Sequence, residues 1–269
     1  MEGAGLKSKG VRMNLHDHTS DIKIDDVRQI VEVGNPTNMG FDFVQAFWRG
    51  HSDAEWHLLP HVFRHNPFPG GPIYNESGLI GHFLVRAPTR SIAKTPEPND
   101  YFGWLFLAQH YGLPTRLLDW SESSLVTLYF AVTDHEDRDG CVWALRPGGL
   151  NTHFRAGSAL VQIRGAKVVE IAECPFNPEK ECDQVIIAID GREIDLRMLA
   201  QMGRFTLHSD RTPMELLPGS ERWLRRFIIP KAHKQKVRRQ LSVMGIRRSN
   251  LFPDLHNLAA ELREMWFEL

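Results

Sequence analysis

The densest group of chemically useful side chains lies in the segment 109–120, Gln-His-Tyr-Gly-Leu-Pro-Thr-Arg-Leu-Leu-Asp-Trp. It carries an imidazole (His110), a guanidinium (Arg116) and a carboxylate (Asp119) within ten residues. Groups of this kind bind anions and transfer protons when a fold brings them together. Asp119 could orient His110 or pair with Arg116. The structural alternative makes His110 a hydrogen-bonded core histidine and Asp119 a neighbour of the next helix cap.

Two further polar residues stand at the ends of predicted strands, where a scaffold displays chemistry. Arg49 precedes Gly50, whose missing side chain permits close backbone approach. An arginine can donate two parallel hydrogen bonds to a phosphate or a carboxylate. The alternative for Arg49 is a buried pair with Asp119 or another acid. Gln201 comes just before Gly203 and a predicted strand, which can place its amide in a cleft.

Metal-binding patterns are weak in this sequence. His16, Asp17 and His18 could bind a metal, but we interpret them as part of a polar loop. Cys174 and Cys182 lack the CxxC or CxxH spacing of a zinc site, so we predict no metal. The motifs GxGxxG, GxxxxGK[ST], HExxH and GxSxG are missing as well, which argues against Rossmann dehydrogenases, P-loop NTPases, zincins and α/β-hydrolases.

The elements around these residues follow from local patterns. Residues 43–49 alternate in the manner of a strand, which puts Arg49 at its end. Residues 101–111 predict a buried helix with Asp100 as N-cap and Gly112 as its stop. A short strand is expected at 115–119. A second helix is expected at 123–133, capped by Ser121 or Ser123.

The rest of the chain adds shorter elements, with Asp254 as the expected cap of the last helix. We expect helices at 21–33, 193–199, 231–244 and 254–267, and strands or extended segments at 141–145, 185–189, 205–208 and 227–229. The predicted fold class is therefore α+β: a single domain at residues 21–269 with a mixed or antiparallel sheet interrupted by short helices. Residues 1–20 lack periodicity and predict a flexible lead-in.

Composition excludes several classes of protein. The chain has 269 residues, of which 42% are hydrophobic and 24% charged, values typical of globular proteins. It has no apolar segment of signal-peptide or transmembrane type, so we expect no membrane partner. Three cysteines argue against a disulfide framework and for reduced thiols in a cytoplasmic protein.

A formal net charge of −1 hides an uneven distribution. Residues 197–248 hold 13 Lys and Arg against 3 Asp and Glu, a net of +10, whereas residues 119–195 hold 7 against 14, a net of −7. The basic helix offers a contact surface for RNA or DNA phosphates. The alternative is that this face packs on the acidic half or stays solvated. Its cations are Lys231, Lys234, Lys236, Arg238 and Arg239.

Several blocks of the sequence resemble the bacterial FRG domain, which is named after a phenylalanine-arginine-glycine motif. The central block is 109–120, and the resemblance extends from about residue 40 to 260. Trp48 stands where the naming phenylalanine usually lies. The other blocks are Phe47-Trp48-Arg49-Gly50, Leu128-Tyr129-Phe130-Ala131, Gln201-Met202-Gly203-Arg204-Phe205 and Phe252-Pro253-Asp254-Leu255.

The order of elements is also similar to that of ADP-ribosyltransferases, which split NAD. Such folds open with a strand carrying aromatic-Arg-Gly, whose arginine binds the NAD diphosphate. They continue with a strand ending in Ser or Thr, a helix with an Ala-x-x-Phe-Ala-like face, and a strand, as 117–121, 128–131 and 141–145 do here. Gly203 departs from the pattern, because the fold often has at this position the glutamate that stabilises the ribosyl oxocarbenium ion.

This resemblance implies an ADP-ribosyltransferase-like fold with NAD as substrate. It assigns catalysis to Arg49, His110, Asp119 and Gln201, and NAD binding to Arg49, Gly50, Tyr111, Thr115, Arg116 and Ser121. The implied function is an NAD-dependent ADP-ribosyltransferase or NAD glycohydrolase. It would act as a toxin or phage-defence effector, with nucleic acid as a target and an antitoxin or immunity protein as a partner. The alternatives are a non-catalytic module that binds nucleic acid or protein, and a nuclease.

Overall fold

The computed structural model describes residues 22–34, 46–64, 75–90, 95–191 and 196–267, and the account below is confined to them. Two sequence-based predictions lie wholly outside these residues: the lead-in at 1–20 and the metal-binding alternative at His16 to His18.

One mixed sheet of eight strands forms the centre of the molecule, in the order β1-β8-β4-β2-β3-β7-β6-β5. The edge pairs β1–β8 and β5–β6 are parallel and the others are antiparallel, so the mixed α+β prediction is confirmed. The strands are β1 Ile22–Lys23, β2 Phe47–His51, β3 Leu117–Ser121, β4 Gly140–Leu145, β5 Val161–Gln162, β6 Ile186–Asp190, β7 Gly203–His208 and β8 Leu224–Ile229.

The sheet is nearly divided between β2 and β3. All five residues of β2 pair with β4, and all five residues of β3 pair with β7. Between β2 and β3, in contrast, Trp48 opposite Ser121 is the one described pair. The two halves of the sheet therefore diverge from a single point, and their facing edges lose most of the backbone ladder that would close them.

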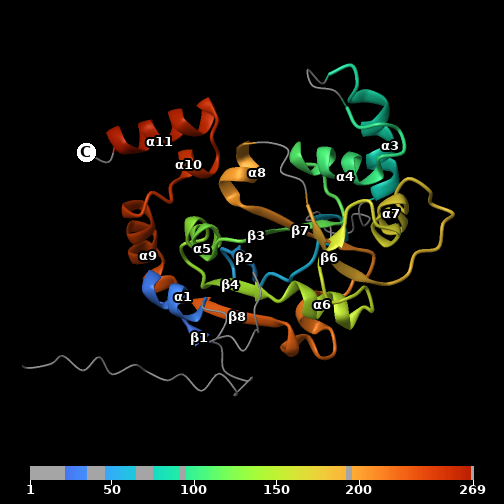
Figure 1. Cartoon of the computed structure of the whole chain (residues 1–269). Helices are drawn as coiled ribbons and strands as arrows, with labels where there is room; N and C mark the ends of the chain where they lie inside the picture. The colour runs from blue at the N-terminus through green and yellow to red at the C-terminus, as the bar shows by residue number, and fades with distance from the viewer. Residues whose placement is uncertain (1–21, 35–45, 65–74, 91–94, 192–195, 268–269) are drawn as a thin grey trace, which may run out of the picture.

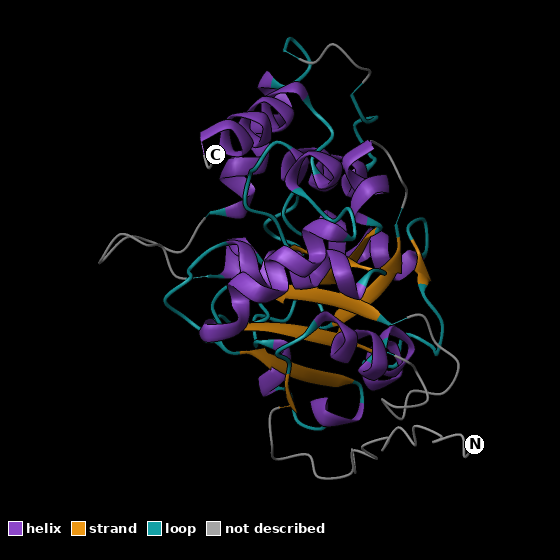
Figure 2. Cartoon of the chain, turned by 90° about the vertical axis from the view of Figure 1, so that its left-hand side faces the viewer, coloured by secondary structure: helices purple, strands orange, loops and turns teal. Residues whose placement is uncertain are grey.

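Helices cover both faces of the sheet (Figures 1 and 2). On one face, a hydrophobic cluster joins the β8-β4-β2 half mainly to three helices, and a second cluster joins the β3-β7-β6 half mainly to three others. The first three are α1 Val27–Val33, α5 Ser124–Thr133 and α9 Lys231–Val243; the others are α3 Glu76–Arg86, α4 Tyr101–His110 and α7 Ala166–Glu173. The opposite face packs on α6, Pro147–His153, and on two short 3-10 helices.

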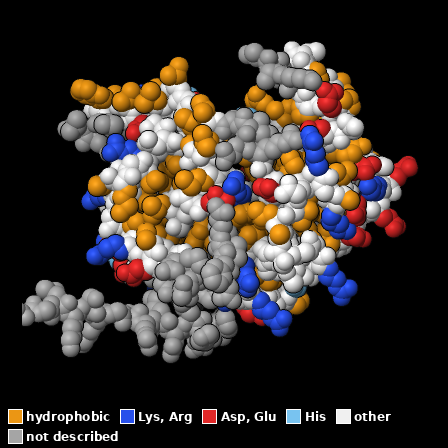
Figure 3. All heavy atoms as spheres, viewed as in Figure 1, with side chains coloured by type: hydrophobic (Ala, Val, Ile, Leu, Met, Phe, Trp, Pro, Cys, Tyr) orange, Lys and Arg blue, Asp and Glu red, His pale blue; other side chains and the backbone are white. Residues whose placement is uncertain are grey.

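Three further helices lie near one end of the sheet: α8 Leu196–Gln201, α10 Arg248–Leu251 and α11 Leu255–Phe267. Asp254 caps α11 by accepting from the backbone of Asn257 at 2.8 Å, as expected. The apolar stripe of α11 is nevertheless exposed, with Leu255 at 83% and Trp266 at 76%. Figure 3 shows hydrophobic side chains over this helix at the upper left. No helix among the described residues has the length and apolar character needed to cross a membrane.

Sequence patterns locate most elements and misplace several boundaries. The predicted helix at 21–33 begins as strand β1, and α1 starts after Asp26, which forms a capping box with Gln29. Strand β3 lies two residues later than expected. Ser123 caps α5, and Gly112 ends α4 with a φ of +86°, both as predicted. Helices α3, α6, α7 and α10 were not expected.

The expectation of reduced thiols is wrong for one pair. Cys174 and Cys182 form a disulfide, with their Cα atoms 6.4 Å apart. The turn after α7 brings the chain back: the amide of Phe176 donates to Glu173, and Lys180 pairs with the same glutamate at 2.5 Å. Sequence spacing did not show this return, because the eight-residue separation fits an open loop equally well.

Candidate functional site

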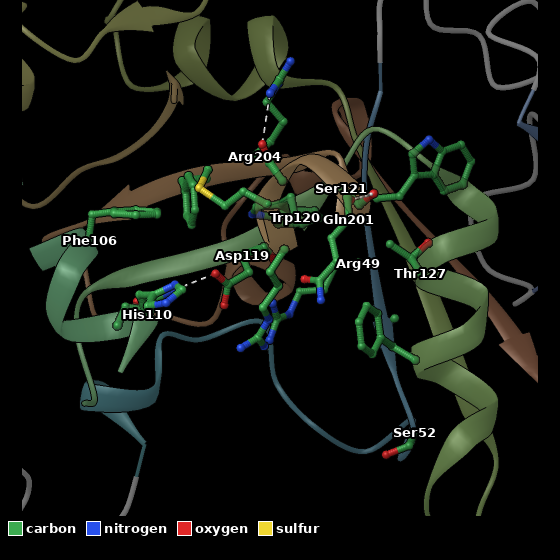
Figure 4. A pocket seen from close by; sticks show the side chains of 18 of the residues that line it. Arg49, Ser52, Phe106, His110, Asp119, Trp120, Ser121, Thr127, Gln201 and Arg204 are labelled. Atoms are coloured by element: carbon green, nitrogen blue, oxygen red, sulfur yellow. Dashed lines mark hydrogen bonds between the residues drawn. The ribbon is translucent and has the colours of Figure 1, made fainter. Parts of the chain in front are cut away.

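A pocket of about 340 Å³ lies where β2 and β3 diverge (Figure 4). Its walls come from the two facing strands and from α4, α5 and α8. This volume is within the range of small-molecule sites. Six residues singled out from the sequence line it: Arg49, Gly50, His110, Asp119, Ser121 and Gln201.

Arg49 reaches the pocket because the sheet is divided there. Alternation along β2 puts its side chain on the same face as Phe47, opposite to the face on which α5 packs. Since β3 diverges from β2 beyond Trp48, the guanidinium can extend across the missing ladder. Its Nη1 donates to the backbone oxygen of Asp119 at 2.5 Å, and its Nε donates to Nε2 of His51 at 3.0 Å. Arg49 thus joins the two halves of the sheet.

The two described hydrogen-bond acceptors of Arg49 are neutral, and the Asp119 carboxylate acts on this cation through space. Because Nε2 of His51 accepts from Arg49, the proton of this buried imidazole lies on Nδ1, which donates to the backbone oxygen of Trp56 at 3.2 Å. Burial and the arginine lower the pKa of His51 well below its usual value, so the ring is neutral. Burial also lowers the pKa of Arg49, to about 10, and the group stays cationic at neutral pH.

Asp119 stands exposed on the opposite edge of the split. Its Oδ1 accepts from Nε2 of Gln109 at 2.8 Å, and the other end of that amide accepts from the hydroxyl of Thr115. Arg116, which the sequence offered as its ion-pair partner, instead pairs with Glu76 at 2.7 Å. The carboxylate is therefore held by a neutral amide and remains available on the pocket wall.

Ser121 and Gln201 line the pocket and also tie its walls together. The hydroxyl of Ser121 donates to the backbone oxygen of Gln201 at 2.6 Å and accepts from the amide of Ser123 at 2.9 Å (Figure 4). The side-chain nitrogen of Gln201 donates to the backbone oxygen of Leu251 at 3.0 Å. These bonds fix α8 against β3 and α10. Both side chains therefore line the pocket and also hold its walls in place.

Gly50 and Gly203 have different reasons to lack a side chain. A Cβ on Gly50 would lie 1.9 Å from the backbone oxygen of Thr127, so this glycine permits α5 to pack on β2. The close approach that the sequence indicated is therefore made by a helix. At Gly203, which pairs with Ser121, the nearest atom to an added Cβ is 3.6 Å away, and the position is sterically open.

Three residues assigned by resemblance to NAD binding do not line this pocket. Tyr111 is 66% exposed beyond the end of α4. Thr115 is buried and bound to Gln109. Arg116 is buried in a bidentate pair with Glu76, and its Nη1 donates to a backbone oxygen of α7. The described contacts of Thr115 and Arg116 therefore stabilise the fold and are not directed into the pocket.

Aromatic side chains supply much of the pocket wall, and sequence reasoning gave them no role. They are Trp48, Trp56, Phe106, Trp120, Phe130 and Phe205. The rings of Phe106 and Phe205 meet edge to face with centroids 5.5 Å apart. Arg197 and Arg204 also line the pocket, and Arg204 pairs with Glu122 at 2.7 Å. Arg197 lies on α8 and Arg204 on β7, and their convergence at the pocket depends on the pairing of β3 with β7, which local sequence patterns do not show.

The basic helix α9 differs from the expected phosphate-binding surface. Lys234 is only 1% exposed, and its ammonium donates to the backbone oxygens of Ser52, Asp134 and His135 at 2.6 to 3.0 Å. Its assignment to nucleic-acid contact is therefore wrong, because α9 turns this cation inward to carbonyls at the end of α5. Lys231 and Arg239 are exposed on the same helix.

Two other cations of α9 make ion pairs. Lys236 lies 3.3 Å from Asp26, and Arg238 lies 3.6 Å from Glu136. Part of the helix thus docks on acidic neighbours. Within the described ranges, no three His, Cys, Asp or Glu side chains group in a way that could hold a metal ion.

Comparison with known proteins places the centre of this site in a family. No curated protein and no solved structure matches the chain. Residues 44–140 match the family model of the FRG domain, a shorter span than the resemblance from 40 to 260. The match contains β2, α4, β3 and α5, and so both Arg49 and Asp119. Residues 44–140 of this chain therefore form an FRG domain.

Proposed function

We propose that the pocket binds NAD and breaks the bond between its ribose and nicotinamide, so that the protein acts as an NAD glycohydrolase or ADP-ribosyltransferase. One observation carries the proposal: a cation whose described hydrogen-bond acceptors are both neutral and an available carboxylate face each other across the divided sheet. Arg49 and Asp119 are joined through the Asp119 backbone, so the two charges keep a fixed relation.

Arg49 supports binding of the NAD diphosphate. Its described acceptors are a neutral imidazole and a backbone oxygen, so a phosphate would give the guanidinium a charged hydrogen-bond acceptor. A guanidinium in a low-dielectric site binds phosphate oxygens strongly because its donors are already oriented. The aromatic wall offers surfaces for the adenine and nicotinamide rings.

Asp119 supports the bond-breaking step. When the C1′–N bond breaks, nicotinamide leaves with the electron pair and the ribose becomes an oxocarbenium ion. A carboxylate fixed beside C1′ stabilises that positive charge, and the Gln109 amide holds Asp119 in one orientation. Water or an acceptor then attacks C1′ and loses a proton to Asp119 or to solvent. In the ADP-ribosyltransferase pattern the acid is a glutamate at the position of Gly203, on β7. In this chain we assign the acid to Asp119 on the neighbouring strand β3, where it pairs with Phe205, two residues from Gly203.

The division of the sheet is also the feature on which we base an ADP-ribosyltransferase-like fold for this chain. Consumption of NAD is the chemistry on which we base the toxin or phage-defence role that the resemblance implies. Under this proposal a cell would need an immunity protein or another restraint on the pocket.

The test combines turnover with binding. The full chain is incubated with NAD, free nicotinamide is followed by NMR, and the affinity for NAD is measured by calorimetry. We expect Asp119→Asn to keep NAD affinity and slow nicotinamide release by about 100-fold or more. Arg49→Met should lose NAD binding. Asp137→Asn removes an exposed carboxylate outside the pocket and should match the unmodified chain.

The proposal fails if the unmodified chain neither binds NAD nor releases nicotinamide. It also fails if Asp119→Asn releases nicotinamide at the unmodified rate. Circular dichroism of each variant separates loss of folding from loss of function.

A further inference from the structure

Aromatic rings and arginines meet on the wall of the pocket formed by α5, α8 and α10. Phe130 lines the pocket, and its ring meets that of Phe252 edge to face at 6.0 Å. The guanidinium of Arg197, which also lines the pocket, lies 4.7 Å from the centroid of the Phe252 ring. Both rings are half-buried and Arg197 is exposed. A flat cation stacked on a ring keeps its outer surface available to another planar group.

More arginines continue this wall away from the pocket. Arg248 begins α10 and Arg238 lies on α9, and both are exposed. Both act electrostatically on the phenol of Tyr129, the residue before Phe130, and so lie near it; burial raises the pKa of that phenol and the arginines oppose the rise. The Gln201–Leu251 hydrogen bond fixes α10 beside α8, so the cations and rings form one surface.

We propose that this surface, the arginine track formed by Phe130, Phe252, Arg197, Arg238 and Arg248, binds single-stranded nucleic acid and brings one of its bases to the pocket. The segment 197–248 carries a net charge of +10, which suits a polyanion. Proteins bind single strands by combining cations for the backbone with aromatic and arginine planes for unstacked bases. In a duplex the base faces are stacked inside the helix, so a duplex would bind only through its phosphates and the arginines.

An acidic protein segment is the competing partner for the same cations. It would gain nothing from the stacked Arg197 plane or the Phe252 ring, whereas a base would stack there. Of the α9 cations that the sequence assigned to nucleic acid, the arginine track includes Arg238. Lys234 is buried and Lys236 pairs with the buried Asp26. Arg238 pairs at 3.6 Å with Glu136, and because both of these side chains are exposed, a phosphate can replace that carboxylate.

Transfer of the ADP-ribosyl group to this strand rests on the proposed function. Binding of the strand to the arginine track does not depend on that function. In that transfer the C1′–N bond to nicotinamide breaks, and a nitrogen or oxygen lone pair of the base forms the new bond to C1′. The acceptor proton leaves to Asp119 or to solvent.

The test is fluorescence anisotropy of the full chain with labelled 12-nucleotide single-stranded DNA, single-stranded RNA and the matching duplex, at several NaCl concentrations. We expect at least one single strand to bind about tenfold or more tightly than the duplex. Arg197→Ala/Arg248→Ala should weaken that binding and reduce the slope of log affinity against log salt by about 1.4. Arg164→Ala/Arg222→Ala removes two exposed arginines from other surfaces and should change neither.

Phe252→Leu tests stacking without a change of charge. It should weaken single-strand binding by about fivefold or more and leave the salt slope unchanged. Absence of strand binding, or equal affinity for the duplex, would overturn the arginine track. So would equal competition by polyglutamate together with an unaffected Phe252→Leu variant, which would indicate an acidic protein partner. Nicotinamide release is measured separately and tests the proposed function, whether or not the strand binds.

Discussion

Acidification should destabilise this protein through one buried histidine on β7. His208 is fully buried, and its Nε2 lies 2.7 Å from the hydroxyl of Thr206. That hydroxyl accepts from Nε1 of Trp120 at 3.0 Å, so its own proton points to His208. The imidazole proton therefore lies on Nδ1, which has no described partner. Protonation would break the Thr206 bond and place a second buried charge near Arg49 and Arg116.

The size of the effect follows from proton linkage. Burial first, and then the two arginines, lower the pKa of His208 from 6.5 to about 3. An unfolded chain binds a proton at this histidine below pH 6.5, whereas the folded chain does so only near pH 3. The folded state is therefore favoured above pH 6.5 and loses stability as the pH falls. At pH 5 the loss from this one group is about 2 kcal/mol relative to pH 8.

Urea unfolding at pH 8 and pH 5 measures this loss. His208→Gln lowers stability at pH 8, because it disturbs a packed strand, but it should reduce the change between the two pH values by about 2 kcal/mol. His82→Gln, an exposed position on α3, should leave that change as it is. If His208→Gln and the unmodified chain lose the same free energy on acidification, the linkage argument is wrong.

Three other substitutions test the packing that supports the site. Gly50→Ala should abolish folding or lower the free energy of unfolding by several kcal/mol, because its Cβ would overlap a carbonyl of α5. The control Gly81→Ala places its Cβ in open space, and equal denaturant midpoints for the two variants would contradict the close approach of α5 to β2. Arg116→Met should lower unfolding free energy by about 3 to 5 kcal/mol because Glu76 is left buried and unpaired, and a thermal melt that does not move would refute this. Lys234→Met should lower the free energy of unfolding by about 3 kcal/mol, because three buried carbonyls lose their hydrogen-bond donor. An unchanged urea midpoint would show that the ammonium is dispensable.

Local sequence patterns were sufficient to predict much of the site. Asp100, Ser123 and Gly112 delimit two helices through capping chemistry that depends on a few neighbouring residues. His110 ends α4 and Asp119 lies on β3 after a short turn, so both side chains reach the same pocket. Six of the residues selected from sequence consequently meet in one pocket.

The division of the sheet was not predictable in this way. It depends on one described residue pair, Trp48 with Ser121, between strands separated by two helices. Alternation alone assigned Arg49 to one face of the sheet, but the loss of the ladder directs its guanidinium into the gap. The same limit applies to Gln109, whose role depends on where Asp119 lies after folding.

Periodicity also identified apolar faces without saying what covers them. The apolar residues of α11 have helical spacing, yet Leu255 and Trp266 are largely exposed. In α9 the pattern of positive charge did not distinguish Lys234, which is buried, from Arg239, which is exposed. Burial of a charged side chain depends on acceptors supplied by distant parts of the chain.

A crystal structure of the chain with NAD bound tests the central claim most directly. Our account predicts the diphosphate in contact with the Arg49 guanidinium and C1′ of the nicotinamide ribose beside the Asp119 carboxylate. Both groups would lie in the pocket between β2 and β3. NAD bound at another surface, or a pocket that stays empty at saturating NAD, would contradict the account.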